Sequence, residues 1–420
     1  MVLTVAKVVN NIIESIFITS ELIENLQEIL GEGTYVDVTG MDCHEGDTYM
    51  DGVVISNFAT LPTSTKLSPT NVSALYLMLG SACNMSCRHC TQEPIKSFKC
   101  PNQKLKENVL EFIVDWDKRG GGRFYFWGGE PLLYWNTIKE CIELFESKGM
   151  CNSIYRIFTN GLLLTDEIAE YCNAHNIWVI MSYDAPNPLV ARNNVPSVEN
   201  IKALLKCNKR TVNGVYNAIN NNMVESFKYL ESLFPDTEIT LGFLNVLWKI
   251  PEDLYAFKEG EVRKAILDLF EYYKETHDSY VHRWFITKLL RHIPDFELED
   301  FLENPYPPCA PGRCSLSFDF DGNIKRCHND SITITDLSKE YSDIQDAHTQ
   351  VWKDLLPENC KNCEYLSICR SICPIALLTE DKKEFVQCNY MREFWQAVLD
   401  CEKEFWEVEE VNDGTTYLDK

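Results

Sequence analysis

The cysteines of this chain are concentrated in two short regions. Of the eighteen cysteines, three lie between Cys83 and Cys90 and eight lie between Cys309 and Cys388. They make up about 4% of 420 residues, below the ~8–10% of a short secreted disulfide scaffold. In a chain without an export signal, clusters of this kind indicate metal binding or redox chemistry. The seven cysteines that occur singly are expected to pack as small buried apolar side chains.

Composition and charge exclude several classes of protein. At about 100–200 residues per domain the length suggests two to four domains, and 45% hydrophobic with 24% charged residues is typical of a soluble globular fold. The net charge of −24 opposes binding to nucleic acid or to anionic membranes. Residues 1–20 are apolar but are interrupted by Lys7, Asn10 and Glu14, so they form neither a membrane-spanning helix nor a signal peptide. We expect a cytoplasmic protein with no nucleic-acid or membrane partner.

The N-terminal segment has the pattern of a small α+β unit over residues 1–72. Apolar residues recur at helical spacing from Val2 to Leu30, with a break near Thr19, which predicts two short helices. Two strand-like pieces follow at Thr34–Val38 and Tyr49–Ser56, and a Pro/Thr/Ser-rich linker ends the unit.

Short apolar runs alternate with amphipathic helical patterns over residues 73–300. Six of these runs have the character of strands: Ala74–Leu79, Arg123–Trp127, Ile154–Thr159, Ile177–Ser182, Val215–Ile219 and Glu238–Val246. Six β–α units predict an α/β fold with a parallel sheet, which right-handed crossovers can curl into a partial (β/α)6 barrel. The active site of such a barrel lies at the carboxyl ends of its strands.

The character of the sequence changes again near Pro305. Cysteine, glycine and proline become frequent, with short strands such as Ser315–Phe320. This composition predicts a separate, metal-organised domain over residues 301–395, followed by a C-terminal helix and tail over residues 396–420.

Three cysteines follow the first predicted strand of the barrel. Cys83, Cys87 and Cys90 are presented by one loop, and they make an incomplete ligand set for a 4Fe–4S cube, which takes four ligands. The fourth iron would then be open to a substrate. Structural zinc, with His89 as fourth ligand, is the alternative.

The loop resembles the signature of the radical S-adenosylmethionine (SAM) superfamily, and three further segments agree with it. Gly128-Gly129-Glu130-Pro131 is similar to the superfamily's motif for the methionyl amino group, and Asn160 and Ser182 to Asp184 resemble segments that line the cofactor pocket. The resemblance implies SAM as cofactor, a 4Fe–4S cluster on Cys83, Cys87 and Cys90, and hydrogen abstraction from an unreactive C–H bond.

The C-terminal cysteines resemble the SPASM extension of this superfamily, which carries two auxiliary 4Fe–4S clusters. The resemblance implies one cluster on Cys309, Cys314, Cys327 and Cys373 and another on Cys360, Cys363, Cys369 and Cys388. Three clusters would use all eleven clustered cysteines. An unrelated pair of zinc ribbons is the alternative.

Enzymes with this extension mostly act on peptides. We therefore expect a maturase that crosslinks a ribosomally made precursor peptide and draws electrons from a flavodoxin or ferredoxin. A sulfatase-type maturase is the nearest competitor; such enzymes usually carry aspartate after the cysteine equivalent to Cys327, where this chain has His328, with Asp330 two residues later. His328 and Asp330 are the candidate catalytic bases.

Two further alternatives remain. Peptide epimerisation would need a hydrogen-donating thiol, for which Cys100 is a candidate, and an iron–sulfur electron carrier would need neither Gly128 nor a three-cysteine loop. Residues 1–70 are either a docking unit for the leader segment of the peptide or a structural extension.

Overall fold

The computed structural model describes most of the barrel and parts of the flanking regions. The described residues are 3–9, 12–19, 34–37, 48–50, 53–55, 72–92, 103–244, 250–289, 298–303, 305–306, 311–370, 373 and 384–413. Cys100 and Cys309 lie outside them.

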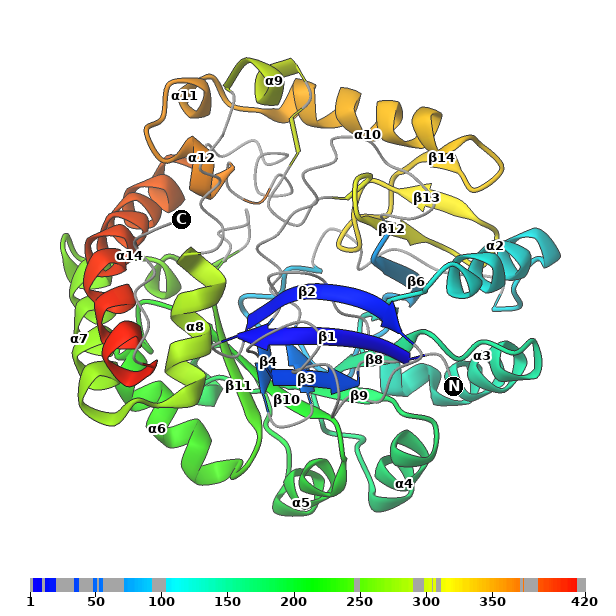
Figure 1. Cartoon of the computed structure of the whole chain (residues 1–420), viewed down its shortest axis with the longest axis horizontal. Coiled ribbons are helices and arrows are strands. Elements are labelled where there is room, and N and C mark those ends of the chain that lie inside the picture. Colours follow the sequence, from blue (N-terminus) through cyan, green and yellow to red (C-terminus); the bar gives the residue numbers. More distant parts are fainter. Residues whose placement is uncertain are drawn as a thin grey trace.

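A nine-stranded sheet forms the centre of the protein (Figure 1). Six neighbouring strands are parallel and follow one another in chain order: β6 (Ala74–Gly80), β7 (Arg123–Gly128), β8 (Ile154–Thr159), β9 (Trp178–Ser182), β10 (Arg210–Tyr216) and β11 (Glu238–Phe243). The sheet is open, because the order runs from β11 to β14 without closing. The prediction of a mostly parallel α/β sheet is confirmed.

One predicted strand was displaced along the chain. The sequence analysis places the fifth strand at Val215–Ile219, whereas β10 begins at Arg210 and ends at Tyr216. The early part of β10 carries Thr211 and Asn213, so its hydropathy resembles a loop. Pairing with β9 and β11 on both sides satisfies the backbone there and makes it a strand.

Helices cover the outer face of the sheet, as Figure 1 shows. They are α2 (Glu107–Lys118), α3 (Trp135–Ser147), α4 (Asp166–Ala174), α5 (Val198–Lys206), α6 (Met223–Leu233), α7 (Glu261–Thr276) and α8 (Ser279–Leu289). Side chains of Thr165, Ser197 and Asn222 cap α4, α5 and α6 by accepting backbone N–H bonds. None of the helices in the described residues is both long and apolar enough to cross a bilayer.

The two faces of the barrel strands differ in burial. Alternate residues such as Leu75, Leu77 and Ile157 are fully buried against the helices. Of the residues between them, which point to the inner face, some such as Tyr76 and Phe158 are partly exposed, whereas Met78 and Tyr125 are buried. Solvent therefore reaches part of the inner face of the barrel.

The sheet continues into the cysteine-rich region. Strand β12 (Ser315–Phe318) pairs in parallel with β6, and β13 (Asn323–Lys325) and β14 (Thr333–Asp336) extend the sheet in antiparallel fashion. Strand β12 thus shares a sheet with the barrel across the domain boundary predicted at residue 301. The other helices of this region are α9 (Leu298–Glu303), α10 (Tyr341–Leu355), α11 (Glu358–Lys361) and α12 (Leu366–Cys369).

The last helix, α14 (Glu384–Asp413), packs against α7 and α8. Two ion pairs join it to α7, Arg263 with Asp400 and Lys274 with Glu404. The helix runs without a break across the boundary predicted at residue 396.

The N-terminal unit is built differently from the prediction. The segment 2–19 was predicted to be helical, but it forms the antiparallel strands β1 (Leu3–Val9) and β2 (Ile12–Thr19). The helix prediction is therefore wrong there. The segment is rich in β-branched Val and Ile, and long-range pairing of β1 with β3 (Thr34–Asp37) favours the extended form.

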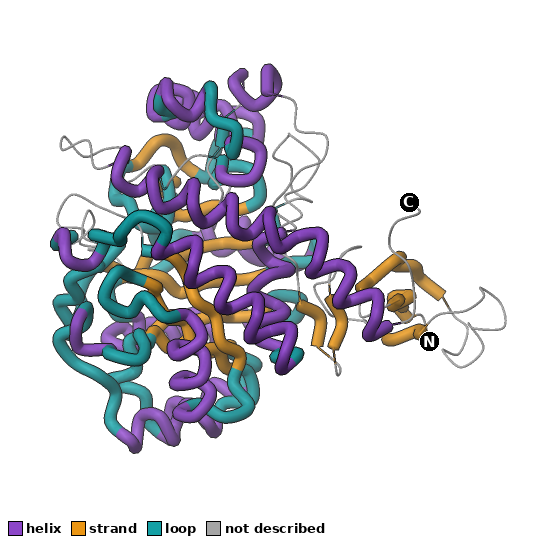
Figure 2. Tube along the Cα trace, turned by 90° about the vertical axis from the view of Figure 1, so that its left-hand side faces the viewer, coloured by secondary structure: helices purple, strands orange, loops and turns teal. Residues whose placement is uncertain are grey.

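The two strand-like pieces predicted in this unit are confirmed. Strand β3 lies in the piece predicted at Thr34–Val38. The piece predicted at Tyr49–Ser56 forms a hairpin of β4 (Thr48–Met50) and β5 (Val53–Ile55). The five strands form one sheet in the order β3-β1-β2-β4-β5. The sheet lies in front of the barrel in Figure 1 and projects to one side of it in Figure 2. The second predicted helix, over residues 21–30, lies outside the described residues.

Candidate active site

The predicted motifs converge at the carboxyl ends of four adjacent strands. The cysteine loop follows β6, Gly128 ends β7, Asn160 follows β8 and Ser182 ends β9. Since parallel strands end at one edge of a sheet, these four segments are neighbours in space.

The cysteine loop lies directly on the two glycines. Gly129 N donates to Gly80 O at 2.9 Å and Glu130 N donates to Ala82 O at 2.8 Å. A Cβ on Gly129 would lie 2.3 Å from Ala82 O, and one on Gly128 would lie 2.3 Å from Gly80 O. Any side chain at either position would displace the loop, so the glycines are needed for this contact.

Glu130 joins the ends of β7 and β8. Its carboxylate accepts hydrogen bonds from Leu132 N at 3.1 Å, Thr159 Oγ1 at 2.7 Å and Asn160 N at 2.7 Å. Only 1% of the residue is exposed, and burial raises the pKa of its carboxyl, although the hydrogen bonds counteract this. A carboxylate has about four lone-pair sites, so most of its capacity is used within the chain.

Asn160 connects the same region to the cysteine loop. Its Nδ2 donates to Asn84 Oδ1 at 2.7 Å and lies 3.9 Å from the Cys83 sulfur. The end of β8 therefore touches both Glu130 and the first cysteine.

A second buried carboxylate supports the loop from the β9 side. Asp184 accepts from Arg192 at 2.9 and 3.2 Å and from Val215 N at 3.0 Å, and it is fully buried. His89 Nε2 lies 3.5 Å from the same carboxylate, and burial lowers the His89 pKa. His89 is thus a buried ring beside Asp184. Arg192 escaped the sequence analysis because no local pattern marks it.

Further contacts hold the loop against the segment after β9. Arg88 N donates to Ala191 O at 2.7 Å, and Ser86 N donates to Asn193 Oδ1 at 2.8 Å. Arg88 Nη2 donates to both carboxylate oxygens of Asp253, at 2.6 and 2.7 Å. The sequence offered no signal for these partners.

The three thiols lie close to one another. Burial raises the pKa of Cys87 to about 11, and repulsion from Cys90 and Cys83 adds to this, while Arg192 lowers it. Cys83 is exposed and the other two thiols are half-buried. In the described residues no group of three Cys, His, Asp or Glu side chains is placed to hold a single metal ion. In a 4Fe–4S cube, by contrast, each of three thiolates would bind a different iron.

Residues 77–224 match the family profile of the radical SAM superfamily. The chain carries a radical SAM domain. The matched segment runs from β6 to the start of α6 and includes all four motifs. The family implies SAM and a 4Fe–4S cluster as cofactors.

Two relatives resemble the chain beyond the radical SAM domain. It is 25% identical over 345 residues to the radical SAM cyclopropyl synthase TigE of Paramaledivibacter caminithermalis, covering 76% of this chain and 71% of TigE. It is 23% identical over 352 residues to the serine-type anaerobic sulfatase-maturating enzyme of Bacteroides thetaiotaomicron, covering 71% of this chain and 82% of that enzyme.

Solved structures share the fold. The structure of native anSMEcpe with bound AdoMet has a TM-score of 0.56 at 16% identity, covering 81% of this chain and 100% of that one. Streptococcus suis SuiB bound to the precursor peptide SuiA has a TM-score of 0.54 at 15% identity, covering 75% and 74% of the two chains.

Cys369, outside the radical SAM domain, lies near Cys360, Cys363 and Cys388. Burial raises the pKa of Cys369 to about 12, and repulsion from Cys360, Cys388 and Cys363 adds to this, while Trp395 counteracts it. These four come from α11, α12, the turn between them and α14. They are the set predicted for one auxiliary cluster.

The structure describes three of the four cysteines predicted for the other auxiliary cluster, Cys314, Cys327 and Cys373. Cys327 belongs to a small apolar cluster that includes Ala191, and Cys373 and Cys388 pack against this cluster. Cys314 precedes β12, where its carbonyl accepts from Ser73 N at 2.9 Å. The Ala191 carbonyl also accepts a hydrogen bond from the cysteine loop. The segment around Ala191 therefore contacts both the cysteine loop of the radical SAM domain and the C-terminal cysteines Cys327, Cys373 and Cys388.

The candidate bases have different surroundings. His328 stacks on Tyr76 with 4.5 Å between ring centroids and meets Trp127 edge-on at 4.6 Å, on the inner face of the barrel. Burial lowers the pKa of His328 to about 4. Asp330 is 3% exposed, pairs with Arg326 and accepts from Ile332 N at 3.2 Å. Only His328 faces the rings of the barrel.

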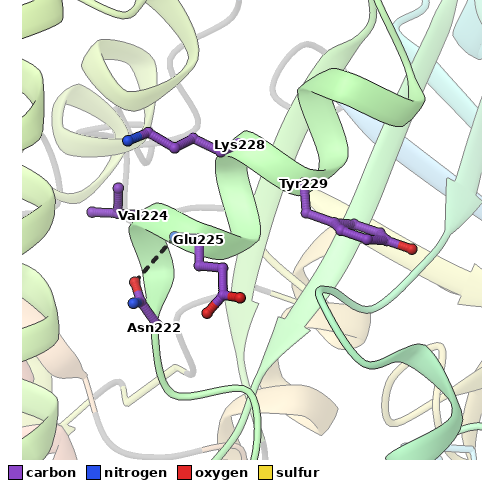
Figure 3. A pocket seen from close by; sticks show the side chains of 5 residues that line it. All are labelled: Asn222, Val224, Glu225, Lys228 and Tyr229. Atoms are coloured by element: carbon purple, nitrogen blue, oxygen red, sulfur yellow. Dashed lines mark hydrogen bonds between the residues drawn. The ribbon is translucent and has the colours of Figure 1, made fainter.

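A pocket of about 440 Å³ lies on the outer helical layer (Figure 3). It is lined by Asn222, Val224, Glu225, Lys228 and Tyr229, and Asn222 Oδ1 accepts from Glu225 N at 3.0 Å. It contains none of the predicted site residues.

We predict that Glu130→Gln lowers both stability and cofactor affinity. One of the buried N–H groups of Leu132 and Asn160 would lose its acceptor, at a cost of about 1–3 kcal/mol. Chemical unfolding of the apo-protein and equilibrium dialysis with SAM measure the two effects. The control is Glu140→Gln, on the exposed side of α3. Wild-type stability in the Glu130 variant would contradict the structural role.

Proposed function

We propose that this protein is a peptide maturase: it abstracts hydrogen from a carbon of a ribosomally made precursor peptide and installs a thioether, ether or C–C crosslink. The partly exposed inner face of the barrel supports this proposal most directly. It begins at the cysteine loop and carries the half-buried rings of Tyr76, Trp127 and Phe158. Such a surface suits a peptide side chain.

The chain's own residues would hold the cofactors at the strand ends. Cys83, Cys87 and Cys90 would bind the cluster, and Gly128 to Pro131, Asn160, Ser182 and Asp184 would line the SAM pocket. When bound, SAM and the reduced cluster supply one-electron cleavage of the sulfonium, and with it the power to abstract hydrogen. The Glu130 and Asp184 networks fix the loop before the substrate arrives.

A crosslink between two side chains removes two hydrogen atoms, that is, two electrons and two protons. Hydrogen abstraction accounts for one of each. Auxiliary clusters held by Cys309, Cys314, Cys327 and Cys373 and by Cys360, Cys363, Cys369 and Cys388 would accept the second electron. The second proton would go to His328, because His328 faces the inner rings while Asp330 is held by Arg326. Since burial lowers the pKa of His328 to about 4, the ring would hold this proton only transiently. A flavodoxin or ferredoxin would reduce the radical SAM cluster.

The relatives favour two kinds of product. TigE is by name a cyclopropyl synthase, which makes C–C bonds. The Bacteroides relative is by name a sulfatase-maturating enzyme, so formylglycine formation is the second candidate function. The presence of His328 after Cys327 disfavours it. Epimerisation through Cys100 is less favoured, because it leaves the auxiliary clusters without a net electron to accept.

We predict about twelve iron and twelve sulfide per chain after anaerobic reconstitution, because eleven clustered cysteines suit three cubes. Replacing Cys83, Cys87 and Cys90 together with Ala should remove about four iron and abolish SAM cleavage. The matched control replaces the single cysteines Cys141, Cys172 and Cys207 with Ala and should keep the iron. Zinc as the main metal of anaerobically prepared protein would refute the cluster assignment.

We predict that the reconstituted enzyme lowers the mass of its precursor by two hydrogens per crosslink. The substrates are synthetic peptides for each short Cys- or aromatic-rich open reading frame found beside the gene, and mass spectrometry follows the reaction. Fragment ions bridged between two residues indicate a crosslink. A product that reacts with hydrazide carries formylglycine instead, and an unchanged mass with an inverted α-carbon indicates epimerisation.

The same assay separates the two candidate bases. His328→Phe keeps a ring between Tyr76 and Trp127 but has no proton acceptor, so crosslinking should fall while SAM cleavage continues. Asp330→Asn should lower stability through the lost pair with Arg326. Full crosslinking by His328→Phe would exclude His328.

We predict that deleting residues 1–70 impairs modification of the full precursor but leaves slow SAM cleavage without peptide. The N-terminal sheet has free edges at β3 and β5 among the described strands, where a leader segment could add as a further strand. Docking would supply effective concentration rather than chemistry. Equal turnover by both forms would exclude docking, and loss of both activities would favour a structural extension.

A further inference from the structure

Arg156 is held on the inner face of the barrel between two aromatic rings. Its guanidinium carbon lies 4.6 Å from the centroid of the Trp178 ring and 5.8 Å from that of Tyr125. Nη1 donates to Tyr125 OH at 3.3 Å, and Nε is buried without a hydrogen-bond partner among the described residues. Rings on either side restrain the planar group while leaving donors unused.

Arg156 contrasts with six arginines of the described residues that each have a carboxylate beside them. In a protein with a net charge of −24, six arginines form ion pairs with Asp or Glu: Arg88, Arg119, Arg192, Arg263, Arg283 and Arg326. Within the described residues Arg156 has none. A partly buried guanidinium without an anion is costly to desolvate.

A second cation lies near Arg156. Lys209 precedes β10, and its carbonyl accepts from Val179 N at 3.0 Å. Burial lowers the Lys209 pKa, and repulsion from Arg156 lowers it further. No ion pair involves Lys209 in the part of the chain that is described. The two cations together create a local positive field.

Arg156 lies on the inner face of the barrel. Arg156, Phe158 and Trp178 are half-buried, whereas Tyr155 and Ile157 on the outer face are buried. Arg156 precedes Asn160 by four residues, which corresponds to about 13 Å along an extended strand. A group bound at Arg156 would thus lie nearer the amino ends of the strands than the cysteine loop does.

We propose that Arg156, assisted by Lys209, binds a carboxylate of the substrate peptide on the inner face of the barrel. The carboxylate belongs either to an Asp or Glu side chain or to the C-terminus. Arg156 Nε, which has no partner among the described residues, could donate a charge-assisted hydrogen bond to a carboxylate. The site would set which residue of the peptide reaches the cysteine loop. The inference rests on the proposed function only in taking the substrate to be a peptide.

The test measures peptide binding without turnover. A labelled precursor, encoded beside the gene, is titrated anaerobically into the reconstituted enzyme, and fluorescence anisotropy gives the Kd. Arg156→Gln should weaken binding about ten- to a hundredfold, as expected for a charge-assisted hydrogen bond. The Kd of the Arg156→Lys enzyme should lie between those of the wild-type and Arg156→Gln enzymes. The control Arg119→Gln removes the same charge from the outer helix α2 and should leave the Kd unchanged.

Peptide variants identify the carboxylate and need no change in the protein. Acidic side chains are replaced singly by amides, and the C-terminus is amidated in a separate peptide. One of these neutralised peptides should bind the wild-type enzyme more weakly than the precursor does. The Arg156→Gln enzyme should bind that peptide no more weakly than the wild-type enzyme does. Wild-type affinity for every neutralised peptide, or no binding of the precursor at all, would overturn the proposal. Arg156-dependent binding without a mass change would instead refute the maturase function and leave the site standing.

Discussion

The buried carboxylate of Glu130 holds the cofactor end of the barrel together. It accepts hydrogen bonds from the start of the turn after β7 and from the end of β8, and its backbone N–H binds the cysteine loop after β6. Three separate segments therefore meet at this one residue, two through its side chain and one through its backbone. A buried carboxylate without these donors would be strongly destabilising, so the three loops and the charge stabilise one another.

Asp184 plays the same part on the other side of the loop. Its pair with Arg192 is buried, and Arg192 brings a positive charge close to Cys87. Thiolates repel one another, so a nearby guanidinium favours the state in which all three cysteines are ligands. Glu130 and Asp184 lie on opposite sides of one cysteine loop, which would restrict the loop to a single conformation before cofactors bind.

The unequal burial of the two strand faces explains how one sheet can serve both stability and chemistry. The outer face packs against helices and provides the core, so the inner face is free to carry rings and charged groups. Tyr76, Trp127 and His328 lie near the upper end of this face, and Arg156 with Trp178 lies deeper. Extension of the sheet by β12 brings Cys327 and His328 to the same barrel, so the cysteine-rich region contributes directly to the inner surface.

The sequence by itself determined the order of the barrel strands and the place of every motif at a strand end. Apolar alternation and cysteine spacing are local properties, and parallel strands must end at one edge. It failed for residues 3–19, because Val and Ile at ambiguous spacing suit either a helix or a strand until long-range pairing decides. It also failed at the start of β10, where neighbouring strands stabilise polar residues. Only the tertiary structure decided that Arg192 pairs with Asp184 and that Arg156 has no ion pair among the described residues. These outcomes depend on how loops and strands pack together, and no local pattern encodes them.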